Sequence, residues 1–64
     1  MVRVMVKLTR LYGIHEVTIL EGEHKHCTAA LITTRPNMRI YNGLILDATI
    51  VRKEGLFIDM VVTT

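Results

Sequence analysis

β-Branched residues dominate this sequence and constrain its fold more than any other feature. Valine, isoleucine and threonine contribute seven, seven and eight residues, which is 22 of the 64 in the chain. Their branched Cβ atoms restrict side-chain freedom in a helix but pack well on a pleated sheet. No window of eleven residues has the spacing of an amphipathic helix. The composition therefore predicts an all-β fold.

Six segments have the alternation or the apolar content that is typical of strands. The clearest is residues 2–8, where valine or leucine at even positions alternates with other, mostly polar residues. Polar or glycine-containing turns separate the segments, and Asn42-Gly43 is the strongest hairpin signal. The expected strands cover residues 2–8, 15–20, 26–34, 38–41, 44–51 and 56–63. Strands this short predict one domain over residues 1–64, a small antiparallel barrel or curled meander sheet of five to six strands.

The two halves of the sequence echo each other at an offset of about 30 residues. Residues 10–13, Arg-Leu-Tyr-Gly, resemble residues 39–43, Arg-Ile-Tyr-Asn-Gly, and residues 16–19 resemble residues 47–50. One interpretation is a duplicated three-strand unit that forms a barrel of two pseudo-duplicated halves. The favoured alternative is that two parts of the chain use the same limited turn and strand chemistry.

Chain length and cysteine content limit how such a domain is stabilised. Ordering each residue costs roughly 1.5 kcal/mol, so small domains often depend on disulfides, metal ions or self-association. Cys27 is the sole cysteine, which excludes an intramolecular disulfide and fits a reducing compartment. Residues 1–8 do not form the apolar core of a signal peptide, and no apolar run approaches about 20 residues. We expect a cytoplasmic protein that does not bind membranes.

The sequence offers little support for catalysis. It contains no serine, and Cys27 is followed by Thr28 and two alanines, a context typical of a small buried hydrophobic residue. Neighbouring side chains of a strand point to opposite faces, so His26 is poorly placed to activate the Cys27 thiol. We therefore expect no enzymatic activity and no cofactor.

Metal-binding residue types are concentrated in residues 21–27. The candidate ligands are His24, His26 and Cys27, with His15 as a further member. Imidazole and thiolate groups suit zinc or copper when three or four converge. Their spacing matches no strong zinc signature, and the alternative is an ordinary solvated hairpin loop.

Apolar residues also occupy strand faces that should be polar in an antiparallel monomer. The last expected strand, residues 56–63, is apolar on both faces apart from Asp59, for which a cross-strand ion pair with Arg39 or Arg52 is expected. Apolar patches of this kind usually mark interfaces. The expected interface residues are Met5, Ile45, Val51, Phe57, Met60 and Val61. The sequence thus favours a non-enzymatic homo-oligomer that works through self-association and protein–protein interaction.

Basic residues and tyrosines indicate an alternative function. Arg10 and Tyr12 share an expected strand face, as do Arg39 and Tyr41. Arginine beside exposed tyrosine suits the binding of single-stranded DNA or RNA through phosphate contacts and base stacking. The candidate residues are Arg3, Lys7, Arg10, Tyr12, Arg35, Arg39, Tyr41, Arg52 and Lys53. The net charge is only +2, because six acidic residues nearly balance eight basic ones, so nucleic acid stays the alternative partner.

Overall fold

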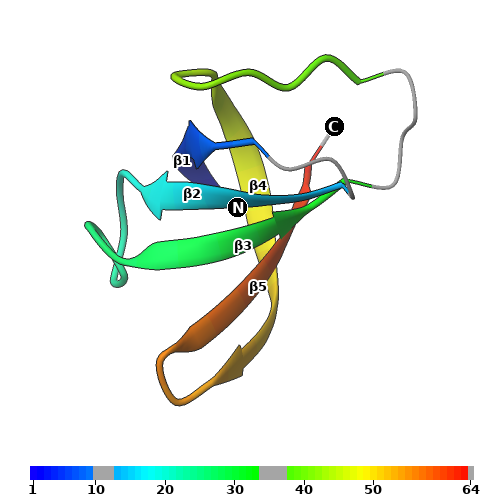
Figure 1. The fold of residues 1–64 in the computed structure, drawn as a ribbon. Helices are drawn as coiled ribbons and strands as arrows, with labels where there is room; N and C mark the ends of the chain where they lie inside the picture. The colour runs from blue at the N-terminus through cyan, green and yellow to red at the C-terminus, as the bar shows by residue number, and fades with distance from the viewer. Residues whose placement is uncertain (10–12, 34–37, 64) are drawn as a thin grey trace.

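The computed structural model describes residues 1–9, 13–33 and 38–63 (Figure 1). These residues form a closed barrel of five strands in the order β1-β2-β3-β5-β4, and β4 pairs again with β1. The strands are β1 (Val2–Leu8), β2 (Ile14–Ile19), β3 (Thr28–Ile32), β4 (Ile45–Glu54) and β5 (Phe57–Val62). The prediction of a small all-β barrel is confirmed. No helix in the described ranges is long and apolar enough to span a bilayer.

Four of the five strand pairings are antiparallel, and the pairing of β3 with β5 is parallel. The parallel contact arises because β4 lies next to β1 rather than next to β3 (Figure 1). A long connection between β3 and β4 makes this crossover, as parallel neighbours require. The barrel is therefore not a simple meander.

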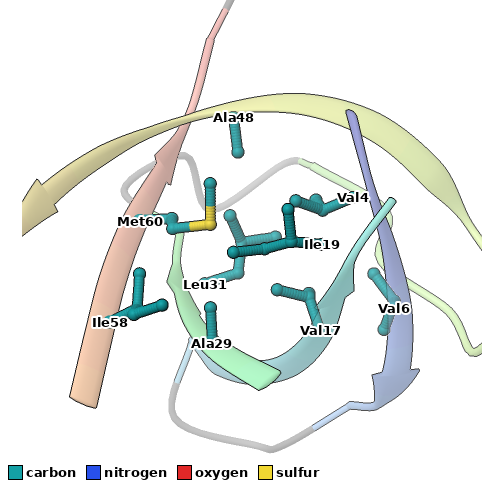
Figure 2. Packing of buried hydrophobic residues seen from close by; sticks show 9 residues of the cluster. All are labelled: Val4, Val6, Val17, Ile19, Ala29, Leu31, Ala48, Ile58 and Met60. Atoms are coloured by element: carbon teal, nitrogen blue, oxygen red, sulfur yellow. The ribbon is translucent and has the colours of Figure 1, made fainter. Parts of the chain in front are cut away.

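The interior is filled by apolar side chains from all five strands (Figure 2). Ile19, Leu31 and Met60 are fully buried and meet near its centre. Burial alternates throughout β2 and β3 and along most of β1 and β5, as the period of two requires. Among residues 1–9, 13–33 and 38–63, the buried cluster consists of Val4, Val6, Val17, Ile19, Ala29, Leu31, Ala48, Ile58 and Met60.

The expected strand over residues 38–41 does not form. Instead, Ile40 and Leu44 pack against the core from the β3–β4 connection. The end of this connection lies beside β1, because the Val6 N–H donates to the Leu44 oxygen at 2.8 Å and the Gly43 N–H to the Val6 oxygen at 2.7 Å. Asn42-Gly43 is thus a turn, with φ of +90° at Gly43, but not the tip of a hairpin.

The third strand begins at Thr28 instead of the expected residue 26. His26 has a φ of +75°, which interrupts an extended strand. Its N–H donates to the Ile19 oxygen at 2.7 Å, and the Cys27 N–H donates to the His24 oxygen at 3.0 Å. These hydrogen bonds fold residues 21–26 into a compact β2–β3 loop.

The two halves of the chain are not equivalent in the part that the structure describes. The first half supplies three strands and the second half supplies two. The second half also contains the long β3–β4 connection in place of a strand. The duplicated three-strand interpretation therefore lacks structural support, and residues 10–12 of the first echo lie outside the described residues.

The β4–β5 hairpin extends beyond the rest of the barrel (Figure 1). Pairing of β4 with β1 ends at Ala48, whereas its pairing with β5 continues to Glu54. A register irregularity between Ile50 and Arg52 places Arg52 opposite Asp59. Such bulges bend a strand and redirect its side chains.

Candidate functional site

A shallow trough of about 340 Å³ lies over β2, β3 and β5. We call it the outer trough, and it is lined by residues 14–16, 28–30 and 56–59. Its central strand is β3, whose outward residues Thr28 and Ala30 are small. The volume falls within the range of roughly 300–1,000 Å³ that is typical of ligand sites.

The pairing of three strands places two carboxylates on either side of the trough floor. Ala30 pairs with Glu16 on β2 and with Asp59 on β5, so the three residues form one row across the sheet. Strand neighbours are about 4.8 Å apart, which puts the Glu16 and Asp59 Cα atoms roughly 10 Å apart. The methyl group of Ala30 leaves the space between the carboxylates open.

Large apolar side chains lie at both ends of the outer trough. Ile14 is half exposed at one end. Leu56 and Phe57 lie at the other end, near the tip of the β4–β5 hairpin, and are 94% and 79% exposed. Phe57 is the sole phenylalanine of the chain, yet it contributes little to the core. Exposing these apolar side chains to water is unfavourable, and a partner that covered them would remove that cost.

The two carboxylates are weakly neutralised. Glu16 Oε2 lies 3.8 Å from Lys7 Nζ, and both side chains are substantially exposed, so this ion pair contributes little. Arg52 is opposite Asp59 but bonds instead to Glu54, with 2.6 Å between Nη2 and Oε2. No side-chain hydrogen bond or ion pair joins the Asp59 carboxylate to another described residue. The outer trough therefore keeps negative charge available to a partner.

The residues expected at an interface divide into outward and inward positions. Ile45, Val51 and Phe57 are exposed, and Met5 and Val61 are partly buried. Met60 is fully buried between β3 and β4, so it belongs to the core and not to a surface. The correction follows from strand parity, because Met60 shares the inward face of β5 with Ile58.

The structure does not gather the described nucleic-acid candidates on one face. Arg39 and Tyr41 lie in the β3–β4 connection, whereas Arg52 and Lys53 lie on the β4–β5 hairpin at the opposite end of the molecule (Figure 1). All four side chains are exposed, and so are Arg3 and Lys7 on β1. Arg10, Tyr12 and Arg35 lie outside the described residues.

Several of these basic residues already face carboxylates. Lys7 contacts Glu16 and Arg52 contacts Glu54. Arg3 is paired in register with Asp47 on β4. A surface on which positive and negative groups alternate attracts a polyanion poorly.

The candidate metal ligands are separated. His24, His26 and Cys27 belong to the β2–β3 loop, but His15 is buried on β2. Four residues of extended strand, roughly 13 Å, separate His15 from the point where that loop begins. In the described ranges, no group of three His, Cys, Asp or Glu residues could hold a metal ion.

Sequence reasoning missed the outer trough because its members come from three strands that are distant in sequence. Phe57 was a candidate, but Glu16, Ala30 and Asp59 were not linked to it or to each other. The available signal was the pair of alanines at positions 29 and 30, which predicts one small outward residue on a central strand. Comparisons with known proteins found no matching family model and no significant match among curated proteins or solved structures.

Proposed function

We propose that this protein is a non-enzymatic barrel module that works through self-association and protein–protein interaction. The observation that carries the proposal is the exposure of Phe57 and Leu56 beside the outer trough. Burying a large apolar side chain contributes about 1.5–3 kcal/mol. Aromatic residues are also enriched among the residues that dominate the affinity of protein interfaces.

The size of the core also supports this proposal. In the part of the chain that the structure describes, nine buried hydrophobic residues stabilise the barrel, and two of them are alanines. A domain with so small a core gains stability from any partner that binds only the folded state. An interface over the outer trough would add the side chains of Leu56 and Phe57 to the buried apolar surface.

The first prediction tests the exposed phenylalanine. We expect Phe57→Ser to weaken self-association by about tenfold or more, because an aromatic residue at the centre of an interface commonly contributes over 1.4 kcal/mol. Light scattering after size-exclusion chromatography, over a wide range of protein concentrations, measures the change. Tyr41→Ser is the matched control, since Tyr41 is an exposed aromatic residue of the β3–β4 connection and does not line the outer trough. A parent that stays monomeric throughout, or equal loss in both variants, would contradict the proposal.

A second function, binding of single-stranded nucleic acid, is favoured by the strand order. A closed five-stranded barrel in the order 1-2-3-5-4 has the topology of the OB-fold. OB-folds bind oligonucleotides or oligosaccharides through the face of strands 2 and 3 and the adjoining loops. This is an analogy of fold, and folds host many functions. The Glu16 and Asp59 carboxylates on this face would repel phosphates, so we rank nucleic acid second.

The second prediction separates these functions. We expect labelled single-stranded DNA and RNA to bind no more tightly than roughly 10⁻⁴–10⁻⁶ M, the range of non-specific binding. Fluorescence anisotropy at two salt concentrations measures this affinity. Tight binding that weakens steeply with salt, and whose salt slope falls in Arg39→Ala and Lys53→Ala, would favour the nucleic-acid function instead.

A further inference from the structure

We propose that the outer trough binds an extended peptide segment of a partner protein in which a lysine or arginine is flanked, two residues away on each side, by large apolar residues. This inference rests on the proposed function and specifies the chemistry of the partner. Three features of the trough carry it: the row of Glu16, Ala30 and Asp59, the apolar ends, and the spacing between them.

The row across the trough selects a positive charge. A cationic side chain above the Ala30 methyl group would lie between the Glu16 and Asp59 carboxylates, which occupy its two sides. Asp59 is partly buried and has no ion pair with another described residue. Among the described residues, the one ion pair of the Glu16 carboxylate is its 3.8 Å contact with Lys7. Covering the trough would exclude water and strengthen the attraction to both carboxylates.

The spacing along the trough matches an extended chain. Outward residues of β3 repeat every two positions, about 6.6 Å apart. On β2, Ile14 lies two residues from Glu16, and on β5, Phe57 lies two residues from Asp59. Because β2 is antiparallel and β5 is parallel to β3, Ile14 and Phe57 lie on opposite sides of the acidic row. The acidic row therefore has a large apolar residue on each side of it, Ile14 on β2 and Phe57 on β5. An extended peptide presents alternate side chains with the same repeat, so a basic residue at its centre meets the acidic row.

Other occupants fit these features less well. Phosphates of a nucleic acid and side chains of an acidic peptide would be repelled by Glu16 and Asp59. A second copy has the pattern around Arg3, with Met1 and Met5 two residues away, but its β1 is already paired on both sides, with β2 and with β4. A basic, apolar segment of another protein is the occupant that both the charges and the spacing favour.

The test uses a fluorescein-labelled peptide with the sequence Thr-Leu-Thr-Arg-Thr-Leu-Thr and the intact protein, monitored by anisotropy. We expect Asp59→Asn and Glu16→Gln each to weaken binding roughly fivefold, as the loss of one exposed charge contact predicts. Phe57→Ser should weaken it as well. Asp47→Asn is the control, because Asp47 is an exposed carboxylate on β4 outside the trough. Circular dichroism verifies that each variant remains folded.

Two further peptides make the result decisive. Replacing the peptide's arginine by glutamate should abolish binding to the parent, and replacing both leucines by alanine should weaken it. The inference is overturned if the arginine peptide does not bind, or if it binds the parent, Asp59→Asn and Glu16→Gln equally. It is also overturned if the parent, with both carboxylates in place, binds single-stranded DNA more tightly than the arginine peptide. The peptide tests can fail while the parent protein still self-associates and Phe57→Ser still weakens that association. This result would overturn the proposed peptide preference but not the proposed function.

Discussion

Met60→Asp is expected to unfold the barrel, whereas Val61→Asp, at the next position of β5, is expected to leave it folded. Met60 has no exposed surface and points toward Leu31 and Ile19 (Figure 2). A carboxylate there would lose its hydration without gaining a partner, at a cost of several kcal/mol. That cost approaches the whole stability of a small domain, which is about 5 kcal/mol. Val61 points outward, and its substitution should cost about 1 kcal/mol.

Far-UV circular dichroism and urea denaturation distinguish the two variants. We expect a cooperative transition for the parent and Val61→Asp, and none for Met60→Asp. If Met60→Asp unfolds at the same urea concentration as the parent, β5 does not present Met60 to the interior. If both variants are unfolded, the outward face of β5 is also buried, which would indicate an obligate interface between copies.

Gly13→Ala is expected to destabilise the barrel more than Gly55→Ala, although both glycines have positive φ values of +77° and +60°. The backbone conformation alone should cost either alanine about 1–2 kcal/mol. At Gly13 the new methyl group would also lie 3.2 Å from Thr33 Oγ1 and 3.3 Å from the Thr33 oxygen. At Gly55 nothing lies within 4 Å of it.

The crowding at Gly13 matters because Thr33 is held there by two hydrogen bonds. Its N–H and its hydroxyl both donate to the Gly13 oxygen, at 2.8 and 3.1 Å. Thr33 cannot move away without weakening this contact between the start of β2 and the end of β3. The free energy of unfolding should therefore fall by a further ~1 kcal/mol in Gly13→Ala, which lowers the urea midpoint. Equal midpoints for the two variants would contradict this account.

The last strand, β5, shows what sequence periodicity can and cannot predict about the two faces of a strand. Parity along residues 56–63 correctly separates Ile58 and Met60 from Phe57 and Val61. Because both sets are apolar, periodicity does not say which set faces inward. Met60 was consequently assigned to an interface together with Val61. The inward face of β5 is fixed by its pairing with β3 and β4, which closes the barrel around Met60.

The β3–β4 connection illustrates the opposite failure. Residues 38–41 alternate and precede Asn42-Gly43, so local signals predict a hairpin strand there. In the structure, Ile40 packs against the core and residues 43–44 bond to Val6. The sequence thus predicted the Asn42-Gly43 turn correctly. It did not predict that the segment next to this turn bonds to β1, a strand distant in sequence.

The sequence by itself determined the all-β fold class and the two faces of most strands, and it left a barrel and a curled meander sheet as alternatives. These properties follow from β-branched composition and from the period of two, which are local. Only the tertiary structure decided that β5 lies between β3 and β4, and so that Glu16, Ala30 and Asp59 share one row. Partner and register in a sheet depend on closing the whole barrel around one core, and no short stretch of sequence encodes that choice.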